Sequence, residues 1–186
     1  MVPLTSLLLP ILLAAVIVYV ASSLIHMVTP LHKNDVRRLP KEDAVIAALR
    51  PLAIPPGDYV VPHVGTHGNL KNPELVDKMN KGPVIFMTVV PNGPPAMAKS
   101  LTLWFVYCIL VSVFAAYIAS RAVGPGTEYL EVFRFAGTTA FGGYALALLQ
   151  NSIWWQRNWG TTLRGMLDGL IYGLLTAGVF GWLWPR

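Results

Sequence analysis

The chain has 186 residues, of which 54% are hydrophobic and 12% are charged, and its formal net charge is +5. This composition is too apolar and too poor in charge for a soluble domain, and it is typical of a membrane protein. The single cysteine excludes an intramolecular disulfide. The basic residues lie beside apolar segments rather than in a basic stripe with interleaved aromatic residues, so the positive charge does not indicate nucleic-acid binding.

Four apolar segments are long enough to cross a bilayer, which requires about 20 residues in a helix. They cover residues 4–25, 101–122, 132–150 and 163–184. We therefore expect an all-α transmembrane fold, a four-helix multi-pass bundle that packs in the lipid bilayer. Its expected organisation is a first transmembrane helix within residues 1–28, an insert over 29–98, and three further transmembrane helices over 99–186.

The first apolar segment can be interpreted as a cleaved signal peptide or as a membrane anchor. Ala21, Ser22 and Ser23 form a tolerable small-residue cleavage site. However, no charged side chain precedes the segment, and its apolar run exceeds the roughly 7 to 15 residues of a signal peptide. We therefore interpret it as an anchor.

The distribution of lysine and arginine indicates how the chain is oriented. Eleven of these residues lie on the side of the insert, whereas three, Arg121, Arg134 and Arg186, lie on the other side. Basic residues near the ends of transmembrane helices concentrate on the cytoplasmic side. We expect a bacterial inner-membrane protein with the insert of residues 29–98 in the cytoplasm and both termini outside.

The insert between the first two apolar segments is predicted to form a small α+β unit. A helix over about 41–50 is favoured by Pro40 before it and by acidic residues in its first turn. Residues 58–61 and 84–90 are rich in β-branched side chains and read as two strands, and 73–79 as a short helix.

All four histidines lie on the insert side, at His26, His32, His63 and His67. Neutral imidazole is the commonest metal ligand, so these residues are weak candidates for a metal site. However, the pair at 63 and 67 lies in a stretch rich in glycine and asparagine, and no HExxH motif or cysteine pair accompanies it. Histidines that face solvent or lipid headgroups are therefore the favoured interpretation.

Two acidic residues lie near or inside transmembrane segments, where charge is costly and marks a functional site unless a partner neutralises it. Glu131 is followed three residues later by Arg134, and Asp168 is preceded by Arg164 four residues before it. Residues at these spacings are neighbours on a helix surface. The sequence therefore predicts two local charge pairs, Glu131 with Arg134 and Asp168 with Arg164.

Small residues recur every four positions in the last apolar segment, at Gly165, Gly169, Gly173, Ala177 and Gly181. On a helix this spacing makes a stripe without large side chains, and such stripes let helices pack closely in lipid. We expect this small-residue stripe to pack against the third segment, because only a short connection joins the two. The third segment has small residues of its own, at Ala136, Ala140, Gly143 and Ala147.

No sequence signature indicates a catalytic group or a cofactor. Residues 93–100 have the spacing of a phosphate-binding loop, but Ala98 replaces its second glycine, and Pro94 and Pro95 remove backbone donors. We therefore expect no cofactor. We favour a non-catalytic structural or accessory component that packs through the small-residue stripe and presents the insert to a membrane-protein partner or a second copy of the chain.

Two alternatives to this structural function remain open. One is a small-solute carrier or channel, which needs polar side chains along its transmembrane helices. The other is a metal-dependent membrane enzyme, which needs the insert-side histidines to converge on one ion.

Overall fold

The computed structural model describes residues 1–65 and 71–186. It divides into two compact units, which are described separately. The first unit comprises Met1–Val36 and Ala96–Arg186, and the second comprises Arg37–Pro95. Residues 29–36, which were assigned to the insert from the sequence, therefore belong with the helices of the first unit.

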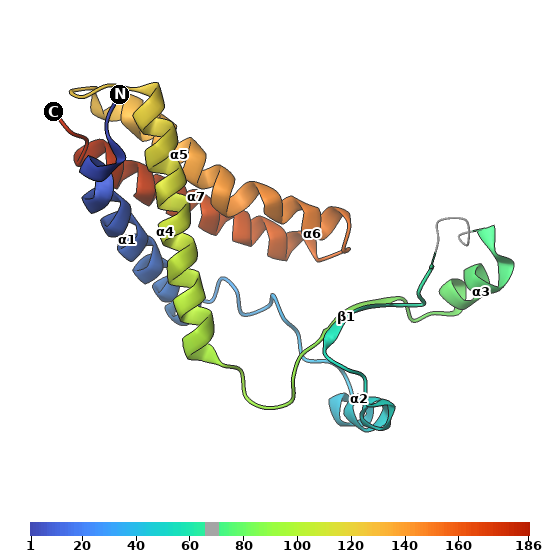
Figure 1. Ribbon diagram of the computed structural model, residues 1–186. Coiled ribbons are helices and arrows are strands. Elements are labelled where there is room, and N and C mark those ends of the chain that lie inside the picture. The colour runs from blue at the N-terminus through green and yellow to red at the C-terminus, as the bar shows by residue number, and fades with distance from the viewer. Residues whose placement is uncertain (66–70) are drawn as a thin grey trace. The chain divides into compact units, whose positions relative to one another are not determined.

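The first unit is a bundle of membrane-length helices (Figure 1). Its elements are a 3-10 turn at Leu4–Leu7, α1 (Leu8–Val28), α4 (Met97–Ala122), α5 (Tyr129–Ala145), a 3-10 turn at Leu146–Leu148, α6 (Leu149–Ile153) and α7 (Trp159–Trp182). Four helical stretches within it are long and apolar enough to cross a membrane, as predicted. By length and composition they indicate a membrane protein.

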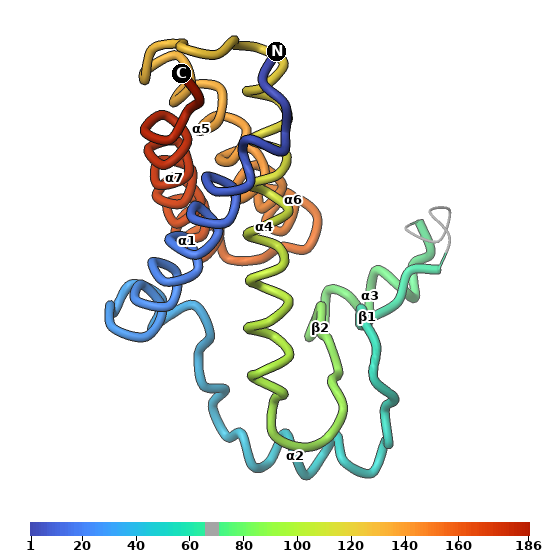
Figure 2. The backbone as a smooth tube through the Cα atoms, turned by 60° about the vertical axis from the view of Figure 1, so that its left-hand side comes forward, coloured from blue at the N-terminus to red at the C-terminus, as the bar shows by residue number. Residues whose placement is uncertain are grey.

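The bundle closes because each long helix packs on two others. α5 packs along α7, α4 packs on α5, and α1 packs on both α4 and α7 (Figure 2). The core between them is rich in small side chains, which let the helices approach closely. Its fully buried members include Ala14, Ala15, Ala115, Ala116, Ala119, Ala136 and Ala140.

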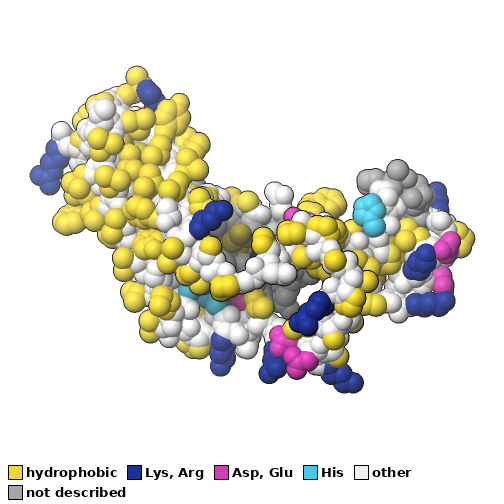
Figure 3. Space-filling view, turned by 60° about the horizontal axis from the view of Figure 1, so that its bottom comes forward, with side chains coloured by type: hydrophobic (Ala, Val, Ile, Leu, Met, Phe, Trp, Pro, Cys, Tyr) yellow, Lys and Arg dark blue, Asp and Glu magenta, His cyan; other side chains and the backbone are white. Residues whose placement is uncertain are grey.

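Large apolar side chains cover the outside of the bundle. On α1, for example, Leu8, Leu12, Val16 and Val20 are all exposed. Figure 3 shows hydrophobic side chains spread over the membrane-length helices on the face in view. Such a surface suits contact with lipid tails rather than water.

The two ends of the bundle contain different segments of the chain. Both termini lie at one end (Figure 1), where the backbone N–H of Val2 donates to the Ser120 carbonyl and the Trp184 indole donates to the Gly124 carbonyl. The end of α1, the start of α4 and the connection from α6 to α7 lie away from the termini. The start of α7 is defined by Asn158, whose side chain accepts a hydrogen bond from the Gly160 N–H.

The small-residue stripe of α7 lies against α5. A Cβ added at Gly169 would lie 2.7 Å from the Cβ of Ala145, and one at Gly173 would lie 3.2 Å from the Cβ of Phe141. Real Cβ atoms do not approach other carbons as closely as 2.7 Å, so the two backbones nearly touch at Gly169. The stripe therefore leaves no room for a side chain at this crossing.

The α5 side of this contact differs from the series of small residues noted in the sequence. The stripe meets positions four residues apart on α5, namely Gly137, Phe141 and Ala145. Ala136 and Ala140 instead point into the bundle core, and a Cβ at Gly143 would face Val111 of α4. α5 does pack along α7 as expected, but it uses a different face from the one that carries Ala136, Ala140 and Gly143, because α5 must present one face to α4 and another to α7.

The second unit contains short elements close to those predicted. They are α2 (Glu42–Leu49), a 3-10 turn at Arg50–Leu52, β1 (Gly57–Val61), α3 (Pro73–Lys81) and β2 (Ile85–Val89). The two strands pair antiparallel, with Tyr59 opposite Met87. In the part of this unit that the structure describes, every side chain is at least partly exposed.

A histidine–carboxylate cluster at the end of α1

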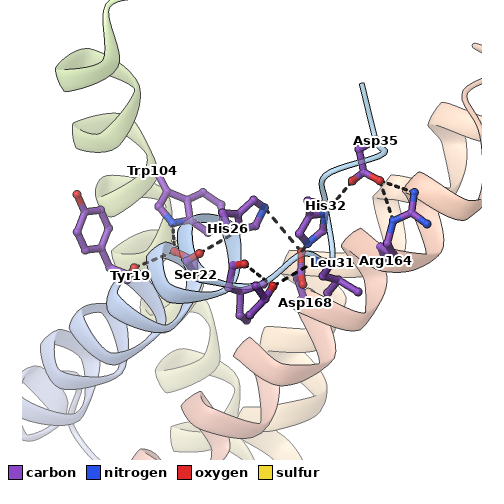
Figure 4. A network of polar contacts seen from close by, with 11 residues as sticks. Tyr19, Ser22, His26, Leu31, His32, Asp35, Trp104, Arg164 and Asp168 are labelled. Atoms are coloured by element: carbon purple, nitrogen blue, oxygen red, sulfur yellow. Dashed lines mark hydrogen bonds and ion pairs between the residues drawn. The ribbon is translucent and has the colours of Figure 1, made fainter. Parts of the chain in front are cut away.

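Three segments of the bundle unit bring five polar residues together (Figure 4). His26 lies in the last turn of α1, and a tight turn after that helix carries His32 and Asp35. Arg164 and Asp168 lie on the first half of α7. We call these five residues the histidine–carboxylate cluster.

His32 lies between the two carboxylates of the cluster. Its Nδ1 is 2.7 Å from Oδ2 of Asp35, and its Nε2 is 2.9 Å from Oδ2 of Asp168. Among the described residues, Nε2 nevertheless finds no hydrogen bond of good geometry, because the contact with Asp168 is close but poorly aligned. Oδ1 of Asp168 is likewise buried and without a hydrogen-bond partner in the described chain.

His26 presents its Nε2 atom to the same carboxylate. Its ring stacks on that of His32, with ring centres 4.3 Å apart and planes 3° from parallel. Nδ1 of His26 lies 3.0 Å from the Ser22 carbonyl, so this nitrogen carries the proton and donates it. Nε2 of His26 lies 3.9 Å from Oδ2 of Asp168.

The helices behind the cluster are tied together by a hydrogen bond. The indole N–H of Trp104 on α4 donates to the Ser22 hydroxyl on α1 over 2.8 Å. Ser22 thus links α4 to the same turn of α1 whose carbonyl orients His26 (Figure 4). Because the Ser22 carbonyl orients the His26 ring, this ring loses little further conformational freedom when it binds a ligand.

The charge pairs of the cluster differ from those expected. Arg164 donates through its Nε and through a second guanidinium nitrogen to Oδ1 of Asp35, whereas Asp168 faces the two histidines. The expectation that Arg164 pairs with Asp168 is therefore wrong. Glu131 and Arg134 are both exposed on α5, and no ion pair joins them in the described structure.

Burial and nearby charged groups shift the pKa values of His32 and Asp35 in opposite directions. Burial lowers the pKa of His32, but hydrogen bonding to Asp35 and attraction to Asp168 outweigh burial and raise that pKa above its ordinary value. Burial raises the pKa of Asp35, but hydrogen bonds from His32 and Arg164 outweigh it and lower that pKa. The cluster therefore favours a charged Asp35.

His26, His32 and Asp168 form a candidate three-residue metal site. One ligand atom from each lies within 4.8 Å of the others. In a tetrahedral zinc site, bonds of about 2.0 to 2.1 Å place ligand atoms about 3.3 Å apart. The nitrogen-to-oxygen distances of 2.9 and 3.9 Å bracket that separation. Two imidazoles and one carboxylate suit zinc and related divalent ions.

Within the first unit, the structure brings together two of the histidines considered from the sequence, His26 and His32. His63 lies exposed in the second unit, and His67 lies outside the described residues. Sequence reasoning missed Asp35 and assigned Asp168 a different partner. A detectable signal was the HxxD spacing of His32 and Asp35 directly after an apolar segment, because a short turn can place those two side chains together.

The geometry of the cluster is the available guide to its chemistry. Searches against protein-family models, curated proteins and solved structures each find no match to this chain.

Proposed function

We propose that this chain is a multi-pass membrane protein that binds one divalent transition-metal ion through His26, His32 and Asp168. Imidazole Nε2 atoms and a carboxylate are the ligands that zinc uses in three-residue sites. Three protein ligands leave one coordination position for water or a substrate, as in catalytic rather than structural zinc sites. A site of this kind is what the metal-dependent membrane enzyme considered from the sequence would require.

The main support for this proposal is the hydrogen bonding of the Nδ1 atoms of His26 and His32. Nδ1 of His26 donates to the Ser22 carbonyl, and Nδ1 of His32 faces the Asp35 carboxylate. Metal-binding histidines commonly donate their second ring nitrogen to a carbonyl or carboxylate, which fixes the tautomer and ring orientation. Nε2 of His32 and Nε2 of His26 lie 2.9 and 3.9 Å from Oδ2 of Asp168, so a cation that displaces the proton of His32 would have all three atoms within reach.

Zinc titration of the purified full chain in detergent tests the proposal. We expect one bound zinc per chain by elemental analysis after dialysis. Protein that retains no zinc above the level of a detergent blank would contradict it.

A second candidate function is structural and needs no metal. With His32 protonated, its charge and that of Arg164 balance those of Asp35 and Asp168, so the cluster is neutral as it stands. In this case the ion pairs of the cluster stabilise the packing of residues 29–36 against α7, and we call this function the clamp. The chain is then a structural membrane component that presents residues 37–95 to a partner.

The dependence of stability on pH separates the clamp from the metal site. The stabilisation from charged His32 is fully present below its ordinary pKa of about 6.5, and it is lost as pH rises through the raised pKa of the folded protein. The stabilisation from Asp35 is lost only as pH falls through its lowered pKa. Zinc affinity instead increases with rising pH, because the metal needs deprotonated His32.

For the clamp, we therefore expect thermal stability measured in EDTA to fall as pH rises through the neutral range. His32→Gln should remove this dependence, because glutamine cannot titrate. If the wild type and His32→Gln show the same pH profile, charged His32 does not stabilise the fold.

We also propose the orientation expected from the sequence, with the cluster on the cytoplasmic side and both termini outside. The excess of basic residues on the insert side supports it, eleven against three. A reporter inserted between residues 91 and 92 should behave as cytoplasmic, and one fused after Arg186 should behave as external. The reverse result would overturn the orientation without affecting the metal proposal.

A further inference from the structure

A cavity of about 170 Å³ opens beside the histidine–carboxylate cluster. Its lining includes the three proposed metal ligands. It also includes Asn151, Arg157, Thr161 and Thr162, from α6, the connection to α7 and the first turn of α7. The cavity thus places a group of hydrogen-bond donors beside the proposed metal ligands.

Arg157 is the cation of this second group. Within the described residues it forms no ion pair, in contrast to Arg164, which is engaged by Asp35. Its backbone N–H donates to the Asn151 carbonyl over 3.1 Å. The preceding residue, Gln156, has a φ of 53°, a left-handed conformation that is costly for a residue with a Cβ. Arg157 is therefore an exposed cation that lines the cavity without a charge partner among the described residues.

The remaining lining residues add neutral donors. Ser152 donates to the Thr162 hydroxyl over 2.8 Å, which leaves the Thr162 proton free to donate elsewhere. Asn151 offers an amide group, and Thr161 offers a hydroxyl at the first turn of α7. The positive end of the helix dipole lies at this turn, which further favours an anion.

Charge balance indicates the sign of the ligand. Arg164 already neutralises Asp35, so a divalent ion on Asp168 and two neutral histidines leaves one positive charge, and Arg157 adds another. An anion with several acceptor oxygens fits a metal, a guanidinium and further donors better than a carboxylate with two oxygens does.

We infer that this cavity binds a phosphate group, with one oxygen on the metal and others accepting hydrogen bonds from Arg157 and its neighbouring donors. This inference rests on the proposed metal site. The phosphate belongs either to a lipid headgroup or to a soluble phosphate compound, since both present the same group.

Cobalt-loaded protein gives a direct readout, because the visible spectrum of tetrahedral cobalt changes when a ligand replaces bound water. Inorganic phosphate added to the cobalt-loaded full chain in detergent should shift the spectrum in a saturable way. Arg157→Gln should weaken the apparent phosphate affinity about tenfold or more, while cobalt affinity without phosphate stays unchanged. Arg134→Gln, at an exposed arginine of α5 outside the cavity, is the matched control and should behave as the wild type.

The outcomes separate this inference from the function on which it rests. If cobalt binds but phosphate leaves the spectrum unchanged, or if Arg157→Gln matches the wild type, the phosphate inference is wrong and the metal proposal stands. If no cobalt binds, both fail. If short-chain phosphatidic acid binds more tightly than inorganic phosphate, the group is a lipid headgroup, and if it binds equally or more weakly, the ligand is a soluble phosphate.

Discussion

Replacing Gly169 with alanine is expected to destabilise the bundle by about 2 kcal/mol, although alanine is the better helix former. The added methyl group would lie 2.7 Å from the Cβ of Ala145, 3.2 Å from its Cα and 3.2 Å from the carbonyl carbon of Tyr144. Two of these atoms are backbone, so rotating a side chain cannot relieve the overlap. α5 and α7 must therefore separate, and contacts are lost along their whole interface.

Gly178 is the matched control, because it lies on the same helix outside the close contact. An added Cβ there has its nearest neighbour, the Tyr129 hydroxyl, at 3.7 Å, which is ordinary van der Waals distance. Gly178→Ala should be neutral or stabilise by up to about 1 kcal/mol. Resistance to unfolding in detergent would compare the two variants, with Gly169→Leu as a more severe case. Equal stability of Gly169→Ala and Gly178→Ala would show that this crossing is not tightly packed.

Removing a proposed metal ligand is expected to cause the second large effect. His32→Ala or Asp168→Asn should lower zinc affinity by more than about 100-fold, because the first removes a ligand atom and the second replaces an anionic carboxylate with a neutral amide, a much weaker zinc ligand. Asp35→Asn should lower it by about 10- to 100-fold, since Asp35 only orients His32 and keeps its Nδ1 protonated. Competition titration with a chromogenic chelator measures all three affinities.

His63→Ala is the control for this series. His63 is exposed in the second unit, so its loss should leave zinc affinity unchanged. Thermal stability in EDTA shows whether each variant still folds. If His63→Ala reduces zinc binding as much as His32→Ala does, the zinc is bound by surface histidines and the proposed site is wrong.

The membrane-length helices and the elements of the insert could be predicted from the sequence. Whether a segment forms a membrane-spanning helix depends on its own length and hydrophobicity, and both are local properties. The strands were likewise marked by β-branched residues bounded by prolines. The start of α7 at Trp159, before the apolar run begins, was not predicted, although Asn158 is a favourable cap.

The position of the small-residue stripe was visible in the sequence, but the residues that it meets were not. Gly169 and Gly173 recur at helical spacing, which is a property of one helix. Their neighbours depend on how α5 is rotated about its axis, because α5 also packs on α4. Side chains on two neighbouring helices decide that rotation together, so it cannot be derived from the α5 segment alone.

The histidine–carboxylate cluster was decided by the tertiary structure. The sequence places Arg164 one helical turn from Asp168, yet Arg164 reaches Asp35, which lies 129 residues away along the chain. An ion pair between neighbouring residues on a helix surface is weak, because water screens its charges. An ion pair in a partly buried site is stronger, because less water surrounds it. The packing of α1 against α7 supplies that partner together with His26 and His32. A sequence lists the charged groups of a chain, but only the fold decides which of them meet away from water.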